Sequence, residues 1–286
     1  MPLDPERLLA HPIPEIRQTL ARKDTMLYAL SVGLGQDPMD DWQRRFVFEK
    51  DLVALPTMAV VLGYPGFWLG DPATGVDAAR VLHGEQSITL HRPLPVEGVV
   101  VGRTRITGLI DRGAEKGAIL YSARDLTDGE GRALATLEST SVLRGDGGFG
   151  GPSGPVRQPH PTPDRPHDAA LALATRPEQA LLYRLNGDYN PLHADPAVAA
   201  RGGFPRPILH GLCTLGVVGH ALLRLACGGA PDRLRRLALR FSAPVFPGET
   251  IETRVWDEGA GRFAFTARAV ERDVTVIGNG LCEVSP

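Results

Sequence analysis

Apolar and polar residues alternate in two groups of segments, one in each half of the chain. In the second half the segments are "RLALRFSAPV", "TIETRVWDE", "RFAFTARAVE" and "TVIGNGLCEV", separated by Gly or acidic turns. The first half offers "EQSITLHRPL", "VVVGRTRITGLID", "GAILYSARDLTD" and "ALATLESTSVL". A period of two predicts strands with one buried face. Each half is therefore expected to end in an antiparallel sheet.

A different pattern precedes the second group of strands. The run "GLCTLGVVGHALLRLACGG", which begins at Gly211, is apolar nearly all round and ends in Gly. A helix that is apolar on every side is a buried one. One long buried helix wrapped by an antiparallel sheet is the hot-dog arrangement, which is an α+β fold.

A faint internal repeat relates the two halves. Three pairs of segments match in the same order: "YALSVG" from Tyr28 with "YRLNGD" from Tyr183, "LPTMAVVLG" from Leu55 with "LCTLGVVGH" from Leu212, and "ITLHRPLPVEGVVVGRTRI" from Ile88 with "LALRFSAPVFPGETIETRV" from Leu237. The offsets are 155, 157 and 149 residues. Residues 144–166 are dense in Gly and Pro and predict a linker. We therefore expect a double hot-dog with repeats over residues 1–143 and 167–286, each with a long central helix.

The stretch "LNGDYNPLH" in the second repeat holds an acid, an amide and an imidazole around an Asn-Pro turn. A helix is expected to run from an N-cap at Thr175 to about Leu185, and Gly187 ends it. After Asp195, the run "PAVAAR" predicts another short helix. Residues 187–195 are therefore expected to form a tight loop between two helices.

This loop carries the candidate chemistry. Asp188 and His193 stand on either side of its turn, and an acid and an imidazole that share one water can act together as general acid and base. The Asn190 amide could orient that water or Asp188. The alternative is that Asp188 is a turn acid and His193 a structural histidine. The first repeat has Ser31-Val32-Gly33 at the matching position, without an acid. Because one half folds without the cluster, a functional role is favoured.

His210 and Gly211 come at the start of the buried helix. The amides of a first helical turn point at negative charge, and Gly lets a ligand approach the backbone. This position suits an oxyanion hole for a thioester carbonyl. A role in close packing is an equally good interpretation of Gly211, and His210 taken singly is more often structural.

Composition narrows the remaining possibilities. The 286-residue chain has a net charge of −2, which gives no electrostatic case for binding nucleic acid or an anionic membrane. No apolar run approaches the ~20 residues that cross a bilayer, so no membrane association is expected. The three cysteines are scattered, so neither a disulfide framework nor a metal site is suggested. The amino terminus does not resemble a signal peptide and "CEVSP" is not a peroxisomal tripeptide, so a cytoplasmic location is expected.

The sequence resembles the MaoC-like, (R)-specific enoyl-CoA hydratase 2 family. The run "YRLNGDYNPLHADPAVAARGGFPRPILHGLCTLG", Tyr183 to Gly216, matches the family signature almost throughout, and "YALSVGLG" and "LHGEQSITLHRPLP" extend the match into the first half. The resemblance is to the double hot-dog form found as the hydratase part of peroxisomal multifunctional enzymes and as free-standing bacterial proteins.

The resemblance implies reversible syn hydration of a trans-2-enoyl-CoA to a (3R)-3-hydroxyacyl-CoA, without a metal or redox cofactor. It assigns Asp188 and His193 as the catalytic pair and Asn190 as their polar support. It also implies that the Gly211 amide, beside His210, holds the thioester oxygen, and that the degenerate first repeat helps to house the acyl chain. His83-Gly84-Glu85 matches the family and is interpreted as structural.

Two other functions remain open from the residues. One is a hot-dog acyl-CoA thioesterase, which shares fold and ligand, and the other is a non-catalytic acyl-CoA binding protein. The intact loop argues against both. We further expect an acyl-CoA substrate and a homodimer of double hot-dog chains. Arg206 is a candidate for the CoA phosphates by its proximity to the motif alone.

Overall fold

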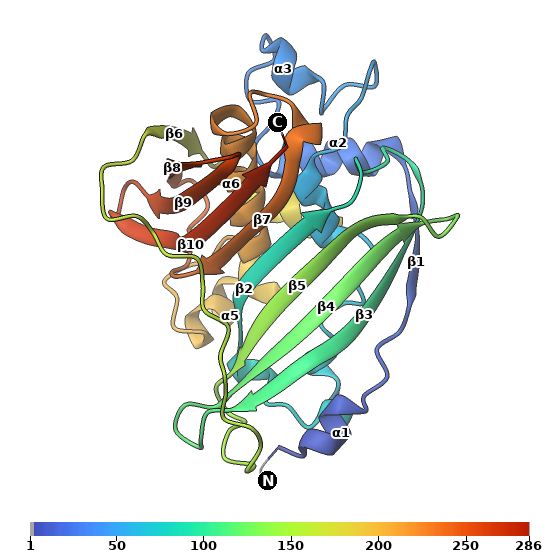
Figure 1. Cartoon of the computed structure of the whole chain (residues 1–286), viewed down its shortest axis with the longest axis vertical. Coiled ribbons are helices and arrows are strands. Elements are labelled where there is room, and N and C mark those ends of the chain that lie inside the picture. The colour runs from blue at the N-terminus through green and yellow to red at the C-terminus, as the bar shows by residue number, and fades with distance from the viewer. Residues whose placement is uncertain (1–2, 286) are drawn as a thin grey trace.

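Within residues 3–285, which the computed structural model describes, ten strands form one antiparallel sheet (Figure 1). The strands are β1 (Ile16–Leu20), β2 (Val81–Leu90), β3 (Gly98–Asp111), β4 (Ala118–Asp128), β5 (Ala133–Leu143), β6 (Ala169–Ala174), β7 (Leu234–Phe241), β8 (Thr250–Gly259), β9 (Arg262–Ala269) and β10 (Val274–Val284). Their order across the sheet is β1-β3-β4-β5-β2-β7-β10-β9-β8-β6.

The two halves of this sheet have the same topology. Read from its outer edge, the first half runs β1-β3-β4-β5-β2 and the second runs β6-β8-β9-β10-β7. They meet where β2 pairs with β7, and Ile88 lies directly opposite Leu237. These two residues are also matched in the sequence repeat, so an approximate two-fold axis passes between them. The predicted α+β double hot-dog fold is thus confirmed.

Eight of the strands follow the alternating segments, but β1 and β6 were not predicted from the pattern. Both are short edge strands, of five and six residues, that pair with β3 and β8 respectively. A segment of this length shows too few alternations to stand out from its surroundings.

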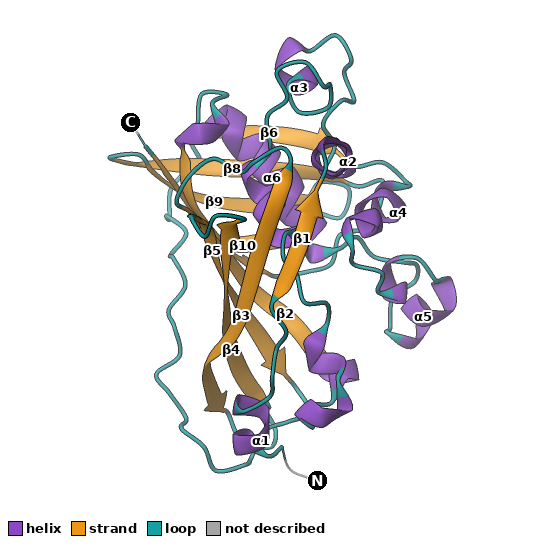
Figure 2. Cartoon of the chain, turned by 90° about the vertical axis from the view of Figure 1, so that its right-hand side faces the viewer, coloured by secondary structure: helices purple, strands orange, loops and turns teal. Residues whose placement is uncertain are grey.

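The long helix α6 (Gly211–Leu225) lies where the apolar run predicted it, and Figure 2 shows it against the sheet. Its interior positions from Cys213 to Leu223 are all buried. The expectation of a long central helix in the first repeat is wrong. The matching segment forms a six-residue 3₁₀ helix, η1 (Pro56–Val61). Gly63, with a φ of 53°, and the following "YPG" end this segment, because positive φ and proline both interrupt a helix.

The other helices are short. They are α1 (Pro5–Leu9), α2 (Arg22–Ser31), α3 (Asp41–Arg44), α4 (Gln179–Tyr183), α5 (Pro196–Arg201) and the 3₁₀ helices η2 (Trp68–Gly70), η3 (Pro72–Thr74), η4 (Ala78–Arg80), η5 (Arg184–Asn186), η6 (Pro191–His193) and η7 (Pro231–Arg233). Among the residues that the structure describes, no helix is both long and apolar enough to cross a membrane.

Two glycines of α6 allow the first repeat to pack closely on this helix. A Cβ added at Gly216 would lie 2.4 Å from Val32 Cγ1, and one added at Gly219 would lie 2.4 Å from Thr57 Cγ2. The two repeats therefore share one core, and side chains at these positions would push them apart.

Gly216→Ala is expected to lower the free energy of unfolding by about 1–3 kcal/mol, the usual cost of overpacking a core. In an unobstructed helix the same change stabilises. Urea unfolding measures the effect. Val32→Ala removes the clashing atom, so Gly216→Ala should cost less in that background. Equal costs in both backgrounds would contradict this account of the packing.

The segment predicted as a linker has no regular secondary structure from residue 144 to 168 and crosses the face of the sheet (Figure 1). Contacts hold it there. Arg157 pairs with Glu138 and lies 4.6 Å from the ring centroid of Tyr121, and Asn279 donates to the His160 carbonyl at 2.8 Å. The division into residues 1–143, 144–166 and 167–286 remains a prediction, since both groups of strands belong to one sheet.

Candidate active site

The loop that carries the polar cluster begins after a shorter helix than the sequence predicted. The N-cap of α4 is Glu178, and Thr175 is not a cap. Instead, Thr175 Oγ1 donates to the Glu249 carbonyl and accepts from the Gly248 amide, which ties the loop before α4 to the turn before β8. Gly187 has a φ of 112° and ends the helical segment, as predicted.

A tight turn follows, and backbone contacts build it. The Asn190 amide donates to Asp188 Oδ1 at 3.2 Å, and Asn190 Oδ1 accepts from the Leu192 amide at 3.0 Å. The Asn190 side chain thus caps η6, while its backbone amide supports Asp188. The expectation that the Asn190 amide orients the water or Asp188 remains a prediction. The predicted helix α5 follows, with Asp195 as its N-cap.

His193 and His210 lie face to face beside Asp188. Their ring centroids are 3.7 Å apart with an interplanar angle of 27°. His193 Nδ1 lies 2.9 Å from the Ile208 carbonyl, and His210 Nε2 lies 3.2 Å from the Asp188 carbonyl. A carbonyl only accepts, so each of these nitrogens carries the proton when the ring is neutral. Nε2 of His193 is then the unprotonated nitrogen.

The surroundings favour neutral imidazoles at both positions. Burial lowers the pKa of His193, although the carbonyl of Ile208 and the charge of Asp188 partly oppose this. Burial, aided by the neighbouring His193, lowers the pKa of His210 to about 3. Both rings are therefore uncharged near neutral pH, and His193 is able to accept a proton.

Gly211 is the first residue of α6, so its amide has no acceptor four residues earlier within the helix. A Cβ at Gly211 would lie 3.3 Å from the ring of Phe241. Both interpretations of Gly211 from the sequence agree with the start of this helix. Its amide belongs to the first turn, and its lack of a side chain allows close packing. The Phe241 ring in turn lies 5.0 Å from that of His83, which brings the first repeat next to the site.

Two side chains of the first repeat near Asp188 were missed in the sequence. Burial raises the pKa of Tyr64 to about 12, and the charge of Asp188 adds to this rise. Tyr64 as a whole residue is 37% exposed, so part of it is open to solvent despite the dense packing around it. Arg124 lies over the Tyr64 ring, 5.2 Å from its centroid, and donates to the Val60 carbonyl at 2.6 Å.

No local pattern marks these two residues, because they reach the site across the boundary between repeats. His83 was interpreted from the sequence as structural, and its hydrogen-bond partner lies within its own strand. Its Nε2 lies 3.1 Å from the Glu85 carbonyl, while Glu85 accepts from Arg240 at 2.7 Å and from Thr140 at 2.9 Å.

Asp188, His193 and His210 each place one potential ligand atom within 4.8 Å of the others. We call these three residues the Asp188 cluster. A metal ion could be held by one carboxylate and two imidazoles, although zinc ligands bond at about 2.0–2.2 Å and would have to move closer together. The prediction that the protein uses no metal remains a prediction.

Comparisons with known proteins identify relatives of both halves of the chain. Residues 158–280 match the family model "MaoC like domain", and residues 19–145 match "MFE-2 hydratase 2 N-terminal domain". The peroxisomal enoyl-CoA hydratase 2 of Arabidopsis thaliana is 40% identical over 94% of this chain and 92% of its own length.

Solved structures extend this result. A MaoC-like dehydratase from Phytophthora capsici is 35% identical, with a TM-score of 0.87 over 99% of each chain. A double hot-dog protein of Mycobacterium tuberculosis, at 17% identity and a TM-score of 0.58 over 95% of this chain and 93% of its own, supports the fold alone. With both halves matched by family models and a full-length relative at 40% identity, the chain belongs to the MaoC-like enoyl-CoA hydratase 2 family.

Proposed function

We propose that this protein catalyses the reversible syn hydration of a trans-2-enoyl-CoA to a (3R)-3-hydroxyacyl-CoA. The observation that carries the proposal is the Asp188 cluster, in which a carboxylate and the unprotonated Nε2 of a neutral imidazole are held together by one loop. The relatives named enoyl-CoA hydratase 2 and MaoC-like dehydratase support the reaction in its two directions.

In the proposed mechanism, Asp188 and His193 bind one water between them. The pair removes one proton from this water as the water oxygen bonds to the β-carbon. The π bond between the α- and β-carbons breaks, and its electrons move toward the α-carbon and the thioester. A proton from the pair then reaches the α-carbon on the same face, so one water is added and the pair is restored. Because coupled groups share protons, we assign the two steps to the pair and not to single residues.

Two neighbours support this chemistry. The Gly211 amide is proposed to donate to the thioester oxygen as negative charge develops there. His210 donates to the Asp188 carbonyl and packs against the His193 ring, so it positions both members of the pair. In the wider site, the six-residue η1 in place of a long helix is consistent with a first repeat that accommodates the acyl chain.

Incubation with crotonyl-CoA tests the proposal directly. Hydration removes the absorbance of the enoyl thioester and yields 3-hydroxybutyryl-CoA, whose 3R configuration is established by chiral analysis. Release of free thiol with retention of the enoyl group would indicate the thioesterase instead. Binding without either change would indicate a non-catalytic acyl-CoA binding protein.

Arg206 is proposed to contact the CoA phosphates. It is exposed and lies over the ring of Phe246, 5.1 Å from its centroid, and its side chain has no ion pair within residues 3–285. We expect Arg206→Ala to raise KM about two- to fivefold at unchanged kcat, as for loss of an exposed charge pair. Arg17→Ala on β1 is the control, and equal effects of both changes on KM would argue against the assignment.

The remaining properties follow from the same assignment. The proposed substrate is an acyl-CoA thioester, and the proposed reaction needs neither a metal nor a redox cofactor. We also propose a homodimer of double hot-dog chains, which sedimentation of the purified protein would test. The cytoplasmic location remains a proposal, because the Arabidopsis relative is named as peroxisomal.

A further inference from the structure

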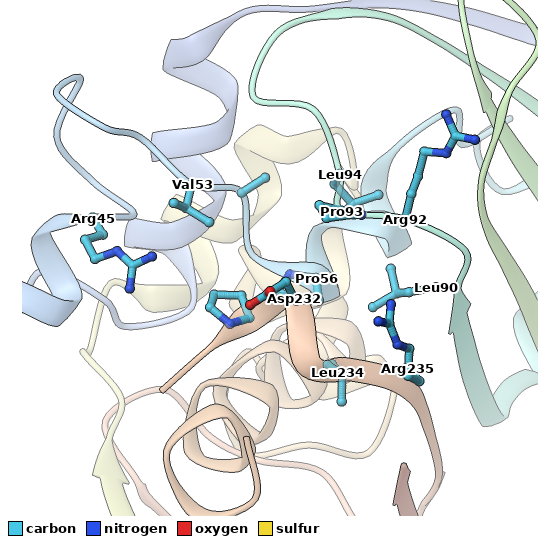
Figure 3. A pocket seen from close by; sticks show the side chains of 12 residues that line it. Arg45, Val53, Pro56, Leu90, Arg92, Pro93, Leu94, Asp232, Leu234 and Arg235 are labelled. Atoms are coloured by element: carbon cyan, nitrogen blue, oxygen red, sulfur yellow. The ribbon is translucent and has the colours of Figure 1, made fainter. Parts of the chain in front are cut away.

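The approximate two-fold axis gives the catalytic region a counterpart on the other side of the β2–β7 pair. The offsets of the repeat match residues near the Asp188 cluster to residues at this second position: His83 to Asp232, Phe241 to Arg92, and Gly211 to Ala54. All three counterparts line one pocket, with a volume of about 310 Å³ (Figure 3). The pocket is therefore the place where a symmetric hot-dog pair would carry its second site.

The body of this pocket is apolar. Leu90, Leu94 and Leu234 line it and are buried, together with Ala54 and Pro56 from the segment that replaces the central helix. Its volume is at the lower end of the range of small-molecule sites. An apolar chain could pack against these side chains without removing water from a charged group.

Three guanidinium groups surround the apolar body. Arg45, Arg92 and Arg235 line the pocket with a single acid, Asp232. Figure 3 shows Arg45 on one side of the pocket and Arg92 and Arg235 on the other. All three arginines are exposed, and their side chains make no ion pair or hydrogen bond within the part of the chain that the structure describes. By contrast, Arg240 on the catalytic side is paired with Glu85.

An apolar pocket with unpaired arginines at its rim suits a molecule that combines an apolar chain with an anionic group. Arg forks bind phosphates and carboxylates through charge-assisted hydrogen bonds. The chemistry of the Asp188 cluster has no equivalent here, because the lining contains no histidine and its single acid is Asp232. A ligand held here would be bound without reaction.

We propose that this pocket is a second, non-catalytic site for an acyl chain that bears an anionic headgroup, the phosphates of an acyl-CoA or the carboxylate of a free fatty acid. The chain lies among Leu90, Leu94 and Leu234, and the headgroup contacts arginines at the rim of the pocket, where Arg92 and Arg235 lie on one side and Arg45 on the other. The proposal concerns binding alone, so it does not depend on turnover at Asp188.

Calorimetric titration with dodecanoyl-CoA tests it, because a saturated thioester cannot be hydrated. The expected result is two molecules bound per chain of the wild-type protein. The triple variant Arg45→Gln, Arg92→Gln, Arg235→Gln should retain one, with the second site weakened by at least about tenfold through loss of its charge-assisted contacts. Its crotonyl-CoA hydration rate should equal that of the wild type.

A charge-matched control separates this site from a general loss of positive charge. Arg17→Gln, Arg112→Gln and Arg144→Gln remove three exposed arginines that have no side-chain partner within residues 3–285, and this variant should still bind two molecules. Thermal melts confirm that both variants are folded. The proposal would be overturned if the pocket variant bound as many molecules of dodecanoyl-CoA and of dodecanoate as the wild type.

Separate titrations with dodecanoate and with CoA identify the headgroup. Binding of dodecanoate that the pocket variant loses assigns the carboxylate. Loss of dodecanoyl-CoA binding with no dodecanoate binding assigns the phosphates. A failure of the crotonyl-CoA assay would leave the difference in binding between the wild type and the pocket variant unchanged, so the two proposals fail independently.

Discussion

Asp188→Asn is expected to reduce kcat for crotonyl-CoA hydration by about 10²–10⁴-fold, the usual contribution of a positioned general acid or base. The amide has the same shape and can still accept from the Asn190 backbone amide, so the loop should remain in place. It cannot take a proton from water. Steady-state kinetics in both the hydration and dehydration directions measure the loss.

The matched control is Asp37→Asn. Asp37 is exposed and accepts a single backbone hydrogen bond from Met39 at 2.9 Å, which an asparagine also accepts. We expect this variant to keep the wild-type rate. If Asp188→Asn also kept it, while binding substrate normally, the proposed mechanism would be wrong.

His193→Asn is the second change with a large expected effect, also about 10²–10⁴-fold in kcat. The asparagine Nδ2 is two bonds from Cβ, as Nδ1 is, so it can donate to the Ile208 carbonyl in place of Nδ1, which preserves the fold of the loop. It offers no basic nitrogen to the water. Combining this change with Asp188→Asn should cost less than the sum of the two single losses, because the residues act as a unit.

The pH dependence of the wild type gives the same residue a second test. Burial lowers the pKa of His193, and the reaction uses its neutral form. The acid limb of kcat/KM should therefore lie below pH 6.5, the ordinary value for histidine, and activity should fall only as the pH drops through the lowered pKa. This limb should be absent in His193→Asn. A limb above pH 6.5 in the wild type would contradict the burial argument.

Local patterns predicted much of this protein. Alternation identified eight strands, since residues on one face of a sheet must be apolar along the whole strand. The all-round apolar run identified α6, and Gly187 and Asn190-Pro191 identified the turn that holds Asp188 and His193. The repeat predicted two copies of one fold, and the matched residues Ile88 and Leu237 pair across its axis.

The same local reasoning was wrong at two places, the expected central helix of the first repeat and the expected N-cap at Thr175. The run from Leu55 matches the start of α6, yet Gly63 and the "YPG" that follows end it as a 3₁₀ helix. Thr175 has the character of an N-cap, but its hydroxyl bonds to the turn before β8, 74 residues away in sequence. Hydrogen bonds between residues this far apart cannot be predicted from the pattern of about ten neighbouring residues.

The sequence by itself determined the fold class and the residue types of the candidate chemistry, because periodicity and turn formation are properties of neighbouring residues. Tertiary structure decided what surrounds that chemistry. The stacking of His210 on His193, the hydrogen bond from His210 to the Asp188 carbonyl and the packing of Arg124 on the Tyr64 ring all join segments that are separated in sequence. The pocket opposite the catalytic side is likewise a product of folding, since it is lined by three separate segments that meet at the junction of the repeats.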